Sequence, residues 1–371
     1  MLYRTARGEK YAEAPDVFAG WETVKTISEF HKMTNLLYYS HNLNNVSLPE
    51  DRRAYLEKNH HILLNRYAFQ NAAMKECGKL FSENGIPHLF YKGLILADNY
   101  HSPDMRYMLD VDILAADKFE TAKNVLCDLG YKITGSDDKH TEFFRSPFVS
   151  IELHRSLVTD RSVTDLDGYW SDISARMIED GNEPSLYHMT TEDEYLFLIS
   201  HIVLHILQNG GVGIRALLDV RLFLDRYGDS IDRSYIDAEL DKMRCRNFEK
   251  RFTSLCGAIL DEGQPTDEDA AMLKFLLLSG IRGSGKNYRA VRNTEKKGSV
   301  DYYRSILFPS YREMHGKYRW LEGKPYLLPA AWAVKAANGV RRKNAAILRR
   351  RKSETIDKIF RDFCLNEILR K

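Results

Sequence analysis

The chain has 371 residues, of which 44% are hydrophobic and 29% are charged, and its formal net charge at pH 7 is +2. This length predicts two or three subdomains in an ordinary globular protein, and the small net charge excludes a global field that would attract nucleic acid or a membrane surface. The five cysteines are scattered, which argues against a disulfide framework or a zinc ribbon and fits a reducing cytoplasm.

No targeting or membrane segment is predicted. Residues 1–15 are polar and lack the apolar centre of a signal peptide. The longest apolar run, residues 195–207, contains two histidines and is too short to cross a bilayer. We therefore expect a cytoplasmic protein with no membrane partner.

Residues 1–84 are predicted to form an N-terminal helical segment. Apolar residues recur at helical spacing in residues 18–39, and again in a long helix from Arg52 to Asn84. Asp51 can cap this second helix and Gly85 can end it.

Residues 85–160 change to an alternation of short strands and helices. Strands are predicted at residues 86–91, 105–114, 131–134, 142–145 and 148–153, and helices at residues 94–100 and 118–129. This order is typical of a compact α+β core built on a small sheet.

Residues 161–371 are predicted to be a larger C-terminal helical region, because strand signals nearly vanish after residue 159. Thr191-Glu192-Asp193-Glu194 has the pattern of a capping box before the apolar helix 195–207, and Gly210-Gly211 ends that helix. Further helices are predicted at residues 214–227, within 235–259, and at 267–278 and 330–371.

The most informative residues for function are Asp110 and Asp112, in the run Met105 to Leu114. On a strand both carboxylates would share one face, where they repel each other unless a divalent cation lies between them. Downstream, Glu152 and His154 also share one strand face. A third carboxylate on a neighbouring strand would complete a two-metal site for Mg²⁺, which prefers carboxylate oxygen.

Three basic residues accompany these acids. Lys92-Gly93 lies at a strand-to-helix turn, where glycine permits close backbone approach and a helix N-terminus favours phosphate. Arg106 either neutralises the acids, holds a phosphate, or is an exposed turn arginine. His154 either orients a carboxylate by a hydrogen bond or takes part in the chemistry.

These motifs carry a resemblance to a known family. The runs Lys92-Gly93, Arg106…Asp110-Val111-Asp112-Ile113-Leu114, Leu126…Leu129-Gly130-Tyr131 and Ile151-Glu152-Leu153-His154 resemble the uncharacterised bacterial nucleotidyltransferase family of the DNA polymerase β-like superfamily. Three later segments are similar to the helical half of that family: His201…His205, Arg215…Leu218-Asp219 and Leu307-Phe308-Pro309-Ser310. The resemblance covers roughly residues 60 to 320.

The resemblance implies a nucleotidyltransferase palm, a small mixed sheet with helices, in which Asp110, Asp112 and Glu152 bind two Mg²⁺ ions. Lys92 and Gly93 would hold the nucleoside triphosphate, although the commoner superfamily pattern has Gly or Ser after the glycine and this chain has Leu94. The implied reaction moves a nucleoside monophosphate to a protein, RNA or small-molecule acceptor and releases pyrophosphate. The alternative is a non-catalytic module that binds nucleotide or RNA.

Two pairs of residues in the helical region have more than one possible role. His201 and His205 have the spacing of two metal ligands, but a zinc protease needs Glu where Ile202 stands, so we favour a partly buried pair that contacts backbone or a carboxylate. Arg215 and Asp219 are spaced for an intrahelical ion pair. His205 and Arg215 would reach a substrate only if the helical region closes over the palm.

Two further segments match binding motifs. The run Gly280 to Lys286 has the glycine and lysine spacing of a P-loop, but Asn287 replaces the required Ser or Thr, so a loop is favoured over a P-loop phosphotransferase. The basic run from Arg341 to Lys352 either contacts RNA or is a solvated helix face.

Overall fold

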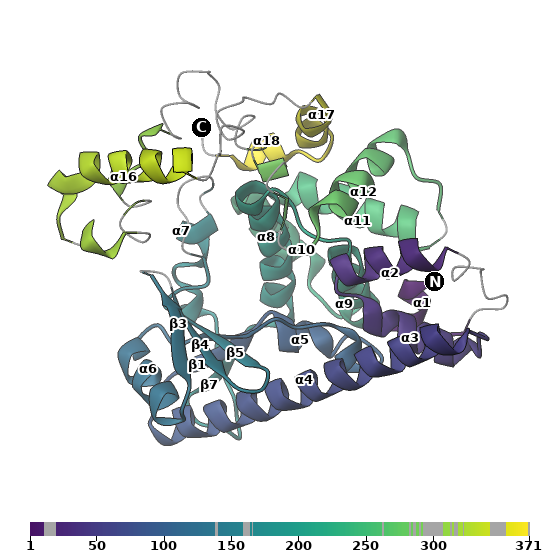
Figure 1. Ribbon diagram of the computed structural model, residues 1–371, viewed down its shortest axis with the longest axis horizontal. Helices are drawn as coiled ribbons and strands as arrows, with labels where there is room; N and C mark the ends of the chain where they lie inside the picture. Colours follow the sequence, from purple (N-terminus) through teal and green to yellow (C-terminus); the bar gives the residue numbers. More distant parts are fainter. Residues whose placement is uncertain are drawn as a thin grey trace.

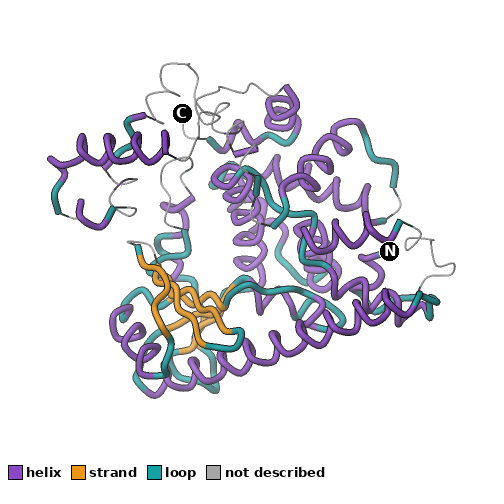
Figure 2. Tube along the Cα trace, in the orientation of Figure 1, coloured by secondary structure: helices purple, strands orange, loops and turns teal. Residues whose placement is uncertain are grey.

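The computed structural model describes a sheet and a set of helices in residues 1–10, 20–137, 140–158, 164, 166–261, 263–281, 283–284, 287–288, 291, 307–311, 314, 318–321, 323–341 and 354–369. Helices predominate, and the strands gather in one part of the molecule (Figure 1, Figure 2). The predicted α+β class is confirmed.

In the described part of the N-terminal segment the helices are α1 (Leu2–Ala6), α2 (Trp21–Phe30), α3 (Thr34–Asn44) and α4 (Glu50–Glu83). The single helix predicted over residues 18–39 is wrong, because Lys32 adopts a φ of 55° between α2 and α3. The long helix predicted from Arg52 is confirmed as α4. It begins after Pro49, and Asp51 lies in its first turn instead of capping it.

The sheet has seven strands in the order β3-β4-β5-β2-β1-β7-β6. Its strands are β1 (His88–Tyr91), β2 (Val111–Leu114), β3 (Lys132–Ser136), β4 (His140–Arg145), β5 (Val149–His154), β6 (Ile178–Glu179) and β7 (Leu186–His188). The central pair β2 and β5 is parallel, β1 also pairs with β7 in parallel, and the remaining neighbours are antiparallel. The sheet is therefore mixed, as the resemblance implied.

Two strands lie beyond residue 160, where almost none were expected. β6 contains two residues and β7 three, so neither is long enough to show an alternating pattern in the sequence. Their pairing with β1 means that the sheet continues past residue 160 into the helical region.

The two faces of the sheet pack against different layers. On one face Val111, Ile113 and Ile151 are buried with Cys77 and Phe81 of α4, which runs beneath the sheet (Figure 1). The helices α5 (Gly93–Ala97) and α6 (Phe119–Asp128) add to this core. The opposite face, which carries the polar residues of β2 and β5, is directed toward the C-terminal helices.

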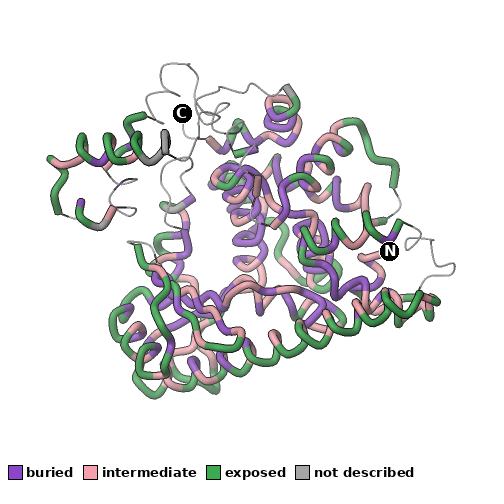
Figure 3. Tube along the Cα trace, in the orientation of Figure 1, coloured by how far each residue is buried: buried purple, intermediate pink, exposed green. Residues whose placement is uncertain are grey.

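The C-terminal region is built around α8 (Thr191–Asn209), which is buried along most of its length (Figure 3). Around it lie α7 (Leu166–Trp170), α9 (Arg215–Tyr227), α10 (Arg233–Lys242), α11 (Arg246–Leu260) and α12 (Asp267–Ser279), followed by α16 (Leu328–Arg341), α17 (Glu354–Asp362) and α18 (Leu365–Ile368). Tyr91 of β1 contacts Phe197 of α8 with ring centroids 5.4 Å apart, which joins the sheet to this core. Among the described residues, no helix has both the length and the apolar character needed to span a bilayer.

Candidate active site

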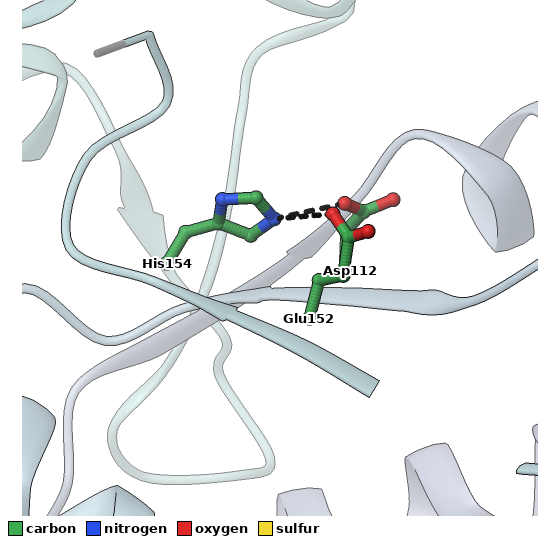
Figure 4. Close-up of side chains that lie close together, drawn as sticks. All are labelled: Asp112, Glu152 and His154. Carbon is green, nitrogen blue, oxygen red and sulfur yellow. Dashed lines mark hydrogen bonds and ion pairs between the residues drawn. The ribbon is translucent and has the colours of Figure 1, made fainter. Parts of the chain in front are cut away.

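Two acids and a histidine meet on the polar face of the sheet (Figure 4). β2 and β5 are direct neighbours, and Asp112 lies opposite Glu152 in their register. His154 Nε2 lies 3.0 Å from Asp112 Oδ1 and 3.3 Å from Glu152 Oε2. The ligand atoms of the three residues all lie within 4.8 Å of one another, so they form a group that could hold a metal ion.

Asp110 lies outside strand β2 and is not one of the three residues whose ligand atoms gather within 4.8 Å of one another. β2 begins at Val111, so the prediction that both aspartates lie within one strand from Met105 to Leu114 is wrong. Arg106 and Tyr107, which precede β2, have no strand partners in the described part of the chain. Arg106 donates to Asp219 of α9, and the carbonyl oxygen of Tyr107 accepts from Arg215 at the start of α9. Burial, and then the charges of Asp112 and Glu152, raise the pKa of Asp110 well above its usual value.

Asp112 is the acid that the protein itself neutralises. Its Oδ1 accepts a hydrogen bond from Lys92 Nζ at 2.7 Å in addition to its contact with His154. Burial would raise the pKa of Asp112, but the charge of Lys92 and the hydrogen bond from His154 outweigh burial and lower it. The orienting role that is one alternative for His154 fits these contacts, since one imidazole nitrogen contacts both carboxylates.

Lys92 occupies a strained position in the turn after β1. Its φ of 59° lies in the left-handed region, which a side chain such as lysine rarely adopts and which costs about 1–3 kcal/mol. This conformation places the ammonium against Asp112. Strain of this kind is retained where surrounding structure fixes a functional residue.

Arg106 connects the same turn to helix α9. It is only 7% exposed, so the exposed-turn alternative is wrong. Its Nε and Nη2 donate to the two carboxylate oxygens of Asp219 at 2.8 and 3.0 Å, and its Nη1 donates to the carbonyl oxygen of Gly93 at 3.1 Å. Tyr100 also donates its hydroxyl to Asp219.

A cavity of about 280 Å³ lies over these residues, between the sheet and helices α8 and α9. The helical region does close over the palm, because His201, His205 and Arg215 line the same cavity as Asp110 and Asp112. Its apolar walls include Tyr91, Ile95, Leu96, Met189, Phe197, Leu198 and Ile202. A partly enclosed pocket with a few convergent charged groups is the usual form of a small-molecule site.

The two histidines lie next to each other in the cavity wall. Their ring centroids lie 4.3 Å apart. Burial, and then the charge of His205, lower the pKa of His201 well below its usual value, and burial followed by the charge of Lys92 lowers the pKa of His205 to about 4. The predicted pairing of Arg215 with Asp219 is present, with Arg215 Nε 3.9 Å from Asp219 Oδ2, whereas Arg106 makes the two shorter contacts.

Glu194 also lines the cavity, although the sequence pattern predicts a different role for it. The predicted capping box assigned Thr191 and Glu194 to the start of α8. In the structure Thr190 is the cap and accepts from the backbone nitrogen of Asp193 at 3.1 Å. The helix therefore begins one residue earlier than a Thr191 cap would require, which leaves Glu194 to face the cavity.

Glu194 makes stability depend on pH. Burial, and then the charge of Asp98, raise the pKa of Glu194 to about 7. The folded state thus holds this proton more tightly than the unfolded state, and the stability that the neutral carboxyl supplies at low pH is lost as pH rises to 7 and above. Glu194→Gln should raise the melting temperature more at pH 8 than at pH 5.5. An equal change at both pH values would contradict this prediction.

Two sequence predictions fall on residues that are only partly described. In the P-loop-like run, Arg282, Gly285 and Lys286 lie outside the described residues, as do residues 342–352 of the basic run. Asn287, which stands where a P-loop needs Ser or Thr, is described, and its Nδ2 donates to Ser279 Oγ at 3.1 Å.

A known protein family matches most of the chain. Residues 19–261 match a family described as an uncharacterised nucleotidyltransferase. No curated protein and no solved structure is similar enough to count as a match. The matched segment is well over half of the chain and contains the acids of the sheet together with α8 and α9. The chain therefore belongs to this uncharacterised nucleotidyltransferase family.

Proposed function

We propose that this protein is a Mg²⁺-dependent nucleotidyltransferase that moves a nucleoside monophosphate from a nucleoside triphosphate to an acceptor and releases pyrophosphate. The observation that carries the proposal is the register of β2 and β5, which puts Asp112 directly opposite Glu152 beside Asp110 and beneath a cavity. Lys92 and His154 offset part of the negative charge, but burial and the charges of Asp112 and Glu152 still raise the pKa of Asp110, so a divalent cation would be stabilised by these carboxylates.

The donor set fits magnesium. Asp110, Asp112 and Glu152 offer carboxylate oxygens, which this hard cation prefers, and all three line the cavity. Bound Mg²⁺ would supply positive charge to the equatorial oxygens at the α-phosphorus and to the leaving pyrophosphate.

The remaining residues would position the reactants. Lys92 holds Asp112 in place through its hydrogen bond, and Lys92 with Gly93 would lie against the triphosphate. Glu152, whose side chain is 28% exposed, would complete the site and assist deprotonation of the acceptor. The apolar wall from α8 would keep bulk water away from the phosphates, which strengthens each charge interaction in the cavity.

The acceptor is a protein, an RNA or a small molecule with a free nucleophile. We also propose that the protein works in the cytoplasm, because all five of its cysteines are free thiols.

Nucleotide binding and turnover are expected together. A nucleoside triphosphate with Mg²⁺ at 100 times its Kd should stabilise the protein by about 2.7 kcal/mol, which a thermal-shift titration detects. Incubation of the protein with labelled triphosphates and cell lysate should then release pyrophosphate and label one class of acceptor. The same titration with EDTA in place of Mg²⁺ is the control.

The rival function, a non-catalytic nucleotide-binding or RNA-binding module, predicts a different result. The contact between Lys92 and Asp112 favours it, since an ammonium already neutralises one of the acids. Stabilisation by nucleotide without pyrophosphate release on any acceptor fraction would support the module and contradict transfer.

A further inference from the structure

A chain of contacts links the turn after β1 to helix α9. Gly93 accepts from Arg106, Arg106 is held by Asp219, and Arg215 lies 3.9 Å from the same carboxylate. Arg215 Nη1 also donates to the carbonyl oxygen of Tyr107 at 2.7 Å. Arg215 therefore lies beside the turn where the triphosphate is proposed to bind, although it comes from a helix more than a hundred residues later.

Arg106 and Arg215 differ in how many of their N–H donors already form hydrogen bonds. Arg106 uses all three of its nitrogens, two on Asp219 and one on Gly93. For Arg215 the described residues provide one hydrogen bond, to Tyr107, while its distance to Asp219 is too long for another. A guanidinium has five N–H donors, so most of those on Arg215 remain available to a ligand.

The charged side chains around the cavity also indicate Arg215 as the ligand-binding residue. Lys92 is matched by Asp112, and Asp219 can neutralise only one of the two arginines that flank it. The side chain of Arg215 is 18% exposed, and Arg215 lines the cavity. Asp219 and Asp110 lie near Arg215, but neither accepts a hydrogen bond from it within the described residues, so an anion in the cavity would give this guanidinium a direct partner.

We propose that Arg215 binds the β- and γ-phosphates of the nucleoside triphosphate, the part that leaves as pyrophosphate. This inference rests on the proposed function and adds a residue of the helical region to the nucleotide site. Arginine suits this task because its planar fork can donate two parallel hydrogen bonds to one phosphate. Arg106 is then a positioning residue, which keeps Asp219 and the Gly93 turn in place while Arg215 faces the ligand.

The test compares ligands that differ only in phosphate number. Isothermal titration with Mg²⁺ should measure the affinities for ATP, AMP and inorganic pyrophosphate in the wild-type protein and in Arg215→Ala. The variant should bind ATP and pyrophosphate about 10- to 100-fold more weakly, the range expected for lost charge-assisted hydrogen bonds. Its affinity for AMP should stay within about twofold of the wild-type value.

Two further variants separate this role from a structural one. Arg215→Lys keeps the positive charge but loses the fork, so its preference for ATP over AMP should fall between those of the wild type and Arg215→Ala. Arg226→Ala removes an exposed arginine from the end of the same helix and should keep the full preference. Because ATP and AMP are compared within one variant, partial unfolding would weaken both ligands alike.

The outcomes distinguish the two proposals. An Arg215→Ala protein that keeps its preference for ATP over AMP, or loses both ligands equally, overturns the role of Arg215 and leaves the transferase proposal standing. A wild-type protein that binds neither ATP nor pyrophosphate overturns both. A selective loss of ATP and pyrophosphate supports the assignment even before any acceptor is known.

Discussion

Replacing Asp110 with Asn should lower nucleotidyl transfer by about a thousandfold or more without weakening the fold. The lost carboxylate would remove several kcal/mol of stabilisation from the transition state, and about 4 kcal/mol corresponds to a thousandfold in rate. Stability should be unchanged or higher in EDTA, because Asp110 is repelled by Asp112 and Glu152. Pyrophosphate release and thermal melting measure the two effects.

Mg²⁺ should affect the melting temperatures of the wild type and of Asp110→Asn differently. Adding Mg²⁺ should raise the melting temperature of the wild type, whose three acids gain a counter-ion, and should have little effect on Asp110→Asn. Asp117→Asn is the matched control, since Asp117 is an exposed residue shortly after β2. Full activity in Asp110→Asn, or a loss of activity in Asp117→Asn, would be incompatible with the proposed site.

Asp219→Asn should destabilise the protein more than any of the other substitutions. Asp219 is buried and accepts hydrogen bonds from Arg106 and Tyr100, with Arg215 close by. Without its charge the buried guanidinium of Arg106 loses its counter-ion, and breaking a buried pair in this way costs about 3–5 kcal/mol. Urea denaturation followed by circular dichroism should show a correspondingly lower midpoint.

An exposed ion pair provides the comparison. Asp241 pairs with Arg246 at 2.7 Å, but its side chain is 57% exposed, so water and salt screen the interaction. Asp241→Asn should leave the urea midpoint close to that of the wild type. Equal shifts for the two variants would show that Asp219 does not hold the palm to α9.

The shared strand face of Glu152 and His154 could be predicted because its signal is local. Alternation along residues 150–154 places Glu152 and His154 on one face, and in the structure Glu152 lies opposite Asp112. The long helix α4 was likewise recognisable from its periodicity.

The cavity could not be predicted in the same way, because its other wall depends on distant contacts. Arg106 and Asp219 are separated by 113 positions, and no pattern around either residue identifies the other as its partner. The sequence around Glu194 fits a capping box that begins at Thr191. In the structure the cap of α8 is Thr190, so Glu194 has no capping role. The short strands β6 and β7 leave too few residues for any periodicity.

The separation of Arg106 from Asp219 also sets an order of events during synthesis on the ribosome. At about 5–20 residues per second, roughly 6 to 23 seconds pass between the addition of these two residues. During that interval the nascent palm carries its acids and the Arg106 guanidinium, but the carboxylate that holds Arg106 has not yet been made. The cavity can therefore form only after α9 has left the ribosome, so a partly synthesised chain lacks a complete cavity wall.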